Sequence, residues 1–306
     1  MMIKRYRSLL MVMALVATLL AGCSNSEPTS DPTTERMQVT VSIVPQQYFV
    51  ERIGGEHVEV NVMVLPGANP ATYEPKPDQL TALSQSRAYF SIGVPFEKVW
   101  LERFASANED MLVVDTAAGI TRLPMATEHH HEGEEGEEGG TEIENPDPHI
   151  WLSPDLVKVQ AQNIHDALVR LDPEHAKDYG QNLASFLADI ETLDTEIRET
   201  LSDLDNRKFI VFHPSWGYFA QDYDLEMLPI EVGGQEPSAA ELVALIEETR
   251  KENIRVIFAQ PEFSTRAAET LADEIEGEVL LISPLAYEWM ENLRQVADTF
   301  ARVLDE

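Results

Sequence analysis

The sequence contains a single cysteine, Cys23, among its 306 residues. No disulfide can therefore form within the chain, and metal centres built from several cysteine thiolates, iron-sulfur clusters included, are excluded. A bound metal would have to be held by histidine, carboxylate, hydroxyl groups or water. The sequence therefore predicts a fold without disulfides and metal ligands other than cysteine.

Motifs of the common enzyme classes are also missing. The chain has no HExxH, no GxSxG and no Walker phosphate loop, and its Gly54-Gly55 pair lacks the spacing of a phosphate-binding turn. An enzyme is therefore not expected. A site of two histidines with open positions could activate water, so a metal-dependent hydrolase is the alternative from another class.

Basic residues are few: 22 Lys and Arg stand against 54 Asp and Glu, a formal net charge of -32. Nucleic acid is not expected as a partner, because its phosphates would be repelled, whereas cations would be attracted. Most of these carboxylates are sufficiently explained as solvent-exposed surface residues that maintain solubility or adapt the protein to high salt.

Only one long apolar run is present, at residues 9–20, and it is too short to span a membrane. It follows Lys4, Arg5 and Arg7, which predicts a secretory signal peptide over residues 1–22. The sequence Leu-Ala-Gly-Cys at 20–23 resembles the lipobox of bacterial lipoproteins, which implies lipid attachment at Cys23. The polar residues 23–37 then form a flexible, membrane-anchored tether outside the cytoplasm, in the periplasm or on the cell surface.

Residues 38–171 predict an N-terminal α/β lobe. Valine and isoleucine alternate at 39–43 and again at 58–64, on either side of a short helix that ends at a glycine pair. Alternation of strand and helix continues to residue 125, which favours a parallel sheet covered by helices on both faces.

An acidic stretch at 128–147 interrupts this pattern. It is rich in Glu and Gly and includes His129, His130 and His131. Such a composition cannot build a core, so we expect an exposed, mobile loop. Imidazoles and carboxylates in a flexible array can bind zinc weakly, which suggests a metal-capture loop.

A long helix and a second α/β lobe follow. Ser153-Pro154-Asp155 is typical of a helix start. The stretch from Pro173 to about Leu204 has helical spacing and no interior proline, which predicts a rigid strut of roughly 45 Å between the lobes over residues 172–204. Alternation resumes over 205–306. The predicted fold class is α/β, with two Rossmann-like lobes of parallel-rich sheet and flanking helices, joined by one long backbone helix.

Four loops lie where open α/β sheets bind ligands, after a strand or before a helix. They are LPGANPATYEPKPD at 65–78, DPHIWLSP at 147–154, FHPSWGY at 212–218 and ISPLAYE at 282–288.

These loops, the acidic insertion and the long helix resemble the zinc and manganese solute-binding proteins of ABC importers, the group with a single helix between its lobes. DPHIWLSP and FHPSWGY are the most specific pieces. The resemblance implies a monomer that captures a divalent cation between its lobes, Zn²⁺ rather than Mn²⁺, and delivers it to a membrane permease. It assigns His149 and His213 as the main metal ligands.

Two positions depart from the family pattern: Ala71 stands where a histidine is usual, and Ser283 where an aspartate is usual. Neighbouring groups such as Tyr73, Glu74 or Glu262 could turn inward, with Ser283 as a poor ligand. Alternatively, a loop histidine could reach over, or the metal could keep waters or arrive as a chelate. The departures also leave open that the same fold binds another solute, or serves as an adhesin-like surface lipoprotein with a degenerate site.

Overall fold

The computed structural model describes residues 36–126, 145–231, 235, 237–252, 254–263 and 265–304. The expected signal peptide, Cys23 and the three consecutive histidines lie outside these residues. Within them, no helix combines the length and the apolar character needed to cross a membrane.

The first sheet contains four parallel strands in the order β2-β1-β3-β4. They are β1 (Met37–Val41), β2 (Val58–Val62), β3 (Ala88–Ser91) and β4 (Leu112–Asp115). Val39 pairs with Val60 on one side and with Ala88 on the other. The predicted βαβ unit is confirmed, because the buried, alternating valines place β1 at the centre of the sheet.

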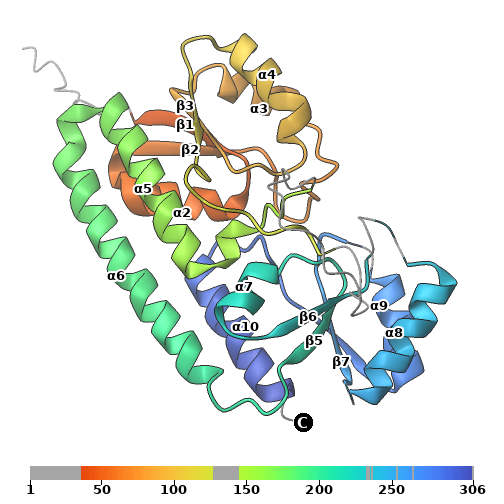
Figure 1. Ribbon diagram of the computed structural model, residues 1–306. Helices are drawn as coiled ribbons and strands as arrows, with labels where there is room; N and C mark the ends of the chain where they lie inside the picture. The colour runs from red at the N-terminus through yellow and green to blue at the C-terminus, as the bar shows by residue number, and fades with distance from the viewer. Residues whose placement is uncertain are drawn as a thin grey trace, which may run out of the picture. The chain divides into compact units, whose positions relative to one another are not determined.

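Three helices connect these strands: α2 (Val44–Gly54), α3 (Pro77–Leu83) and α4 (Glu97–Ala107). The strand order reverses direction after β2. Because crossover connections between parallel strands are right-handed, α2 lies on one face of the sheet and α3 and α4 on the other (Figure 1).

The second sheet repeats this topology in the order β6-β5-β7-β8. Its strands are β5 (Lys208–Val211), β6 (Glu226–Pro229), β7 (Val256–Ala259) and β8 (Glu278–Leu281), connected by α7 (Gly217–Asp222), α8 (Ala239–Lys251) and α9 (Arg266–Ile275). The predicted second α/β lobe is confirmed. The residue that ends α9 is Glu276, in the left-handed region at φ 54°, and Gly277 follows it.

The connection between the sheets runs through η2 (Ile150–Leu152), α5 (Pro154–Leu171), η3 (Pro173–His175) and α6 (Ala176–Thr200), and α10 (Trp289–Val303) closes the chain. The Ser153 hydroxyl caps α5 by accepting the Leu156 N–H at 3.2 Å, as its sequence predicts.

Helix α6 packs against α2 and α5 of the first lobe and against α10 of the second (Figure 1). The predicted helix joining the lobes is confirmed, but it has 25 residues and spans roughly 37 Å, less than expected from 172–204. It is shorter because Pro173–His175 form a 3₁₀ turn and the helix ends at Thr200.

One apolar core continues from the first sheet across α6 to the inner face of the second sheet. The rings of Phe49 and Trp289 meet edge to face with centroids 5.2 Å apart, and Phe186 of α6 lies 5.9 Å from Phe49. A separate, smaller core fills the space between the second sheet and α8 and α9.

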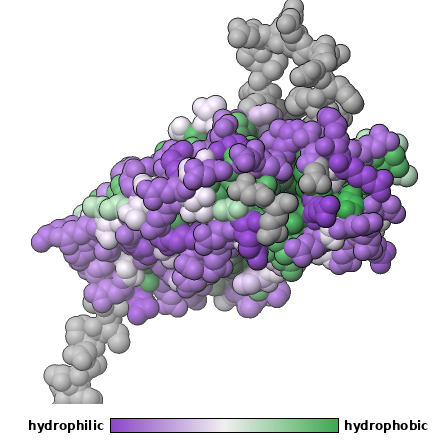
Figure 2. Space-filling model, turned by 90° about the horizontal axis from the view of Figure 1, so that it is seen from below, coloured by the Kyte–Doolittle hydropathy of each residue, from purple (hydrophilic) through white to green (hydrophobic). Residues whose placement is uncertain are grey.

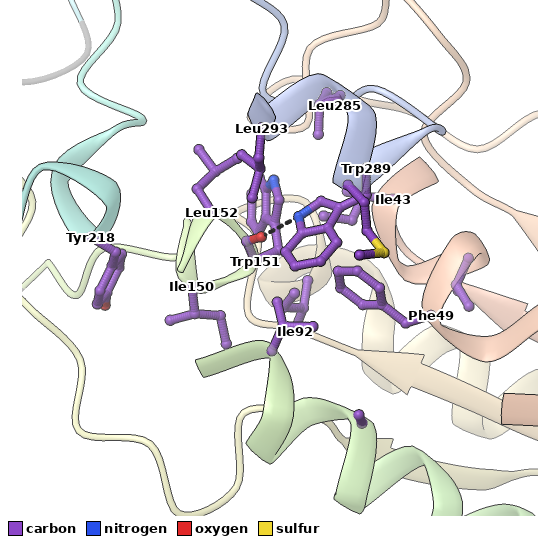
Figure 3. Close-up of a cluster of buried hydrophobic side chains, with 14 of the residues drawn as sticks. Ile43, Phe49, Ile92, Ile150, Trp151, Leu152, Tyr218, Leu285, Trp289 and Leu293 are labelled. Carbon is purple, nitrogen blue, oxygen red and sulfur yellow. Dashed lines mark hydrogen bonds between the residues drawn. The ribbon is translucent and has the colours of Figure 1, made fainter. Parts of the chain in front are cut away.

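Two tryptophans of the larger core, Trp151 and Trp289, join the lobes. The Trp151 indole N–H donates to the Pro284 carbonyl at 2.7 Å. The Trp289 indole N–H donates in turn to the Trp151 carbonyl at 2.7 Å, the dashed line in Figure 3. Both rings are fully buried, so these bonds are protected from water and fix η2 against the second lobe.

Candidate metal site

The predicted ligand loops converge at the carboxyl ends of the strands. His213 lies two residues beyond β5, and Glu262 lies three beyond β7. These neighbouring strands flank the point where the second sheet reverses its order, which is where open α/β sheets bind ligands. Loops that follow β2 and β3, and the loop that carries His149, face them from the first lobe.

A cavity of about 60 Å³ separates the two sets of loops. This is several times the minimum that one water molecule needs. The cavity is lined from both lobes by Asn69, Pro70, Ala71, Val94, Pro95, Met125, Pro148, His149, Trp151, His213, Glu262, Phe263, Pro284 and Leu285.

The imidazole rings of His149 and His213 lie side by side in this cavity. Their centroids are 5.2 Å apart and their planes are inclined by 73°. The two residues are far apart in the sequence and come from opposite lobes, so they become neighbours only when the chain folds.

Asp147 fixes the orientation of His149. Its Oδ1 atom accepts the backbone N–H of His149 at 2.8 Å and lies 2.7 Å from Nδ1 of the ring. A carboxylate at Nδ1 stabilises the tautomer with its proton there, which leaves the Nε2 lone pair to bind a cation. The Asp147 carbonyl also accepts the Tyr218 hydroxyl from α7 at 3.0 Å, so the second lobe helps to hold this loop.

Glu231 plays the same part for His213, because its carboxylate hydrogen-bonds Nδ1 of that ring. The ring stacks on Phe263 with centroids 4.4 Å apart, and Gln260 accepts the His213 backbone N–H at 3.1 Å. Burial lowers the pKa of His213, although Glu231 opposes the effect. The neutral imidazole that a metal requires is therefore favoured near neutral pH.

Glu262 brings a carboxylate to the same cavity. Its Oε1 atom accepts the Ser283 hydroxyl at 3.2 Å, while Oε2 is buried and has no hydrogen-bond partner among the described residues. Burial raises the pKa of Glu262. A buried carboxylate oxygen without a donor is costly, and a cation beside it would remove that cost.

Of the other described residues predicted as ligands, Tyr73, Glu74 and Ser283 do not line the cavity. The Ser283 hydroxyl accepts the Leu285 N–H at 3.2 Å and supports the turn. The Tyr73 hydroxyl donates to Gln79 at 2.6 Å, and Glu74 is exposed. Across the described ranges no three His, Cys, Asp or Glu side chains stand close enough to form a ready-made metal centre.

The other described histidines lie away from the cavity. His57 and His175 stack with centroids 3.8 Å apart beside Asp172 and Asp178. His165 contacts Asp166 on α5. None of these three histidines lines the cavity.

Asp147 and Glu231 were not identified from the sequence. Asp147 carries a signal, since an aspartate side chain can accept the backbone N–H of the residue two positions on, here His149. Glu231 follows β6, the strand beside β5, so its carboxylate ends at the same sheet edge as His213. Only the strand order makes that proximity visible.

The chain matches, over residues 39–303, the family model described as "Zinc-uptake complex component A periplasmic". A crystal structure of ZnuA is 48% identical, covers 88% of this chain and 100% of its own, and superposes with a TM-score of 0.81. A zinc-bound ZnuA lacking residues 138–173 in its own numbering is 47% identical, with 89% and 99% covered and a TM-score of 0.81.

Among curated proteins, the high-affinity zinc uptake system protein ZnuA of Bacillus subtilis is 29% identical over 285 residues. The alignment covers 90% of this chain and 88% of that protein. The family model spans both lobes, and the chain belongs to the ZnuA family of periplasmic zinc-uptake components.

Proposed function

We propose that the protein captures Zn²⁺ outside the cytoplasm and delivers it to the membrane permease of an ABC importer. The observation that carries the proposal is the pair of imidazoles from opposite lobes, each held at Nδ1 by a carboxylate and sharing one cavity. This carboxylate-histidine arrangement is the usual support of a metal-binding Nε2 atom.

His149 and His213 are the proposed main ligands, and Glu262 the third. Zinc prefers nitrogen and carboxylate oxygen in four-coordinate geometry, which these three groups supply in part. Manganese prefers more oxygen ligands, so two imidazoles favour Zn²⁺ over Mn²⁺. The cation is cargo, and no catalytic step is proposed for it.

The remaining parts of the proposal concern residues beyond the described ranges. Cys23 is the proposed lipid attachment point, with a tether that ends before Met37, where β1 begins, rather than at residue 37 as the sequence predicts. The protein is proposed to act as a monomer. His129, His130 and His131 are proposed to gather cations and pass them to the cavity. The zinc-uptake role of the ZnuA relatives supports delivery to a permease.

Calorimetric titration with Zn²⁺ and Mn²⁺ tests the proposal. His149→Ala and His213→Ala should each weaken zinc binding by at least about tenfold, or about 1.4 kcal/mol, because each removes a ligand. His165→Ala, on the surface of α5, is the matched control and should bind like the unaltered chain. Unchanged zinc affinity in both cavity variants would remove the proposed site.

A further inference from the structure

We infer that Tyr218 is a positioning residue for metal capture. It acts through Asp147 to orient the His149 ring, so that the second lobe sets the direction of the ligand that the first lobe provides. The inference rests on the proposed function and adds to it a residue that does not line the cavity.

The Tyr218 hydroxyl joins two segments of the first lobe to α7. It accepts the Leu123 N–H at 2.9 Å and donates to the Asp147 carbonyl at 3.0 Å. The Asp147 N–H donates in turn to the Leu123 carbonyl at 2.8 Å, so the three residues form one closed set of hydrogen bonds. Tyr218 and Asp147 are each 2% exposed, so a bond lost there is not readily replaced by one to water. Burial also raises the pKa of Tyr218 to about 12, and the hydroxyl therefore keeps the proton that it donates.

Asp147 passes this restraint to His149, two residues further along the chain. A single carboxylate oxygen, Oδ1, accepts the His149 backbone N–H at 2.8 Å and lies 2.7 Å from Nδ1 of the ring. The main chain and the ring of His149 are thus both fixed to Asp147, and a shift of Asp147 turns the Nε2 atom. Metal binding depends on that direction, because Nε2 binds a cation through its one lone pair.

Helix α7 also lies close to the carboxylate of Asp147. A methyl group built on Gly217 would lie 3.2 Å from Oδ2 of Asp147, tighter than nine in ten such contacts. The absence of a side chain at Gly217 therefore lets α7 approach Asp147. Neighbouring residues of α7 thus contact both the carbonyl and the carboxylate of the residue that holds His149.

The same segment of the chain carries the other proposed ligand. His213 and Tyr218 both lie in the motif FHPSWGY at 212–218, which runs from the end of β5 into α7. One short segment of the second lobe therefore supplies one imidazole and orients the other. This arrangement explains how two rings from opposite lobes are set 5.2 Å apart before a cation arrives.

Tyr218→Phe removes only the hydroxyl, and Tyr223→Phe is the matched control. Tyr223 is also buried, at 5% exposure, and donates its hydroxyl to Asp194 at 3.0 Å, where neither residue lines the cavity. Calorimetric titration should show zinc binding about three- to tenfold weaker in Tyr218→Phe, the loss that corresponds to one buried hydrogen bond. Zinc binding by Tyr223→Phe should be unchanged.

Nuclear magnetic resonance of the metal-free protein tests the positioning itself. In the unaltered chain the ring nitrogens of His149 should give the ¹⁵N chemical shifts of the tautomer protonated at Nδ1. Tyr218→Phe should move these shifts toward the average of the two tautomers. The shifts of His213, which is held by Glu231, should stay the same, and Tyr223→Phe should change neither ring.

A second pair of variants disturbs the same contact without removing a hydrogen bond. Gly217→Ala places a methyl group against Asp147 and should also weaken zinc binding. Gly180→Ala, on α6, is its control. A methyl group there would lie 3.9 Å from the His165 ring, an ordinary contact, and zinc binding should not change.

Zinc affinity in Tyr218→Phe equal to that of the unaltered chain would overturn the inference, as would a loss of equal size in Tyr223→Phe. Unchanged His149 ring shifts in Tyr218→Phe, or equal zinc affinity in the two glycine variants, would also overturn it. His149→Ala distinguishes this failure from failure of the proposed function. If His149→Ala binds zinc as the unaltered chain does, the proposed function fails, whereas a loss there without one in Tyr218→Phe removes only the role of Tyr218.

Discussion

At the scale of single residues, the carboxylates behind the two imidazoles control what the cavity can bind. Glu231 is buried at 7% exposure and reaches Nδ1 of His213 across the sheet edge. Its negative charge makes the ring a stronger donor and holds its orientation.

Glu231→Gln should therefore weaken zinc binding by roughly tenfold or more. Removing a carboxylate that hydrogen-bonds a metal-binding histidine typically lowers metal affinity about 10- to 100-fold. The matched control is Glu226→Gln, at the exposed first position of β6, the strand that Glu231 follows. Calorimetric titration distinguishes them. Equal zinc affinity in both variants would show that Glu231 has no part in metal binding.

Asp222, at the end of α7, is expected to make the stability of the protein depend on pH. Burial raises its pKa to about 6, and one of its oxygens has no hydrogen-bond partner among the described residues. Because the folded-state pKa lies above the ordinary value of 3.8, its contribution to stability is present below that value and lost as the pH rises through 6.

Asp222→Asn should raise the free energy of unfolding at pH 8 by about 1–2 kcal/mol, a value reduced for partial exposure, and change it little at pH 4. Urea unfolding at the two pH values checks this. Asp203→Asn, an exposed position, should show no such difference. A gain of equal size at pH 4 and pH 8 would rule out the titration of Asp222 as its cause.

At the residue scale the sequence predicts metal ligands only where a motif carries the chemistry. His149 and His213 were predicted because the loops DPHIWLSP and FHPSWGY resemble those of the zinc and manganese solute-binding proteins. The absence of a ligand at Ala71 was also readable directly. The hydrogen-bond partners of His213 could not be predicted in this way, because Glu231 and Gln260 approach it only through strand order and register.

At the scale of elements, the short helix η2 links the metal cavity to the interface between lobes. It follows His149 directly, and its Trp151 is bonded to Pro284 through the indole and to Trp289 through the carbonyl. In Figure 3 Trp151 and Leu152 of η2 and Trp289 of α10 cluster together with Phe49 of α2. The cavity wall is thus tied to both lobes.

Trp289→Phe should destabilise the protein by roughly 2–4 kcal/mol, since it leaves the buried Trp151 carbonyl without its donor and shrinks a fully buried ring. Urea unfolding measures the loss. Trp100→Phe, a half-buried tryptophan on α4, is the matched control and should cost less. A smaller loss in Trp289→Phe than in the control would contradict the role of this bond.

The sequence predicts which segments are helices and which are strands, whereas the residues at which they end are known only from the structure. Alternating valines gave β1 and β2, and Ser153-Pro154 gave the start of α5. The strut was predicted too long, because a continuous helical spacing does not show that Pro173–His175 turn more tightly than an α-helix.

At the scale of the whole molecule, the excess of acidic residues is expressed at the surface. Hydrophilic side chains dominate the face shown in Figure 2, and the hydrophobic ones on it form small, separate patches. A net charge of -32 attracts cations toward any point of the molecule, whereas the paired imidazoles define the proposed binding site. General attraction and specific capture are therefore separate properties of the chain.

The two-lobed architecture was predictable as a whole, because each lobe repeats the strand-helix alternation that builds a parallel sheet. The continuity of the core across both lobes was not. Phe209 and Phe258 of the second sheet belong to the same apolar cluster as Phe49 of the first lobe. No local sequence pattern predicts that residues so far apart in the chain share one core.

The most direct test of the central claim is anomalous diffraction at the zinc edge from crystals of the protein grown with Zn²⁺. The account predicts one strong peak in the cavity between the lobes, within about 2.0–2.1 Å of Nε2 of both His149 and His213. A peak bound to only one of these rings, or no peak in the cavity, would contradict it.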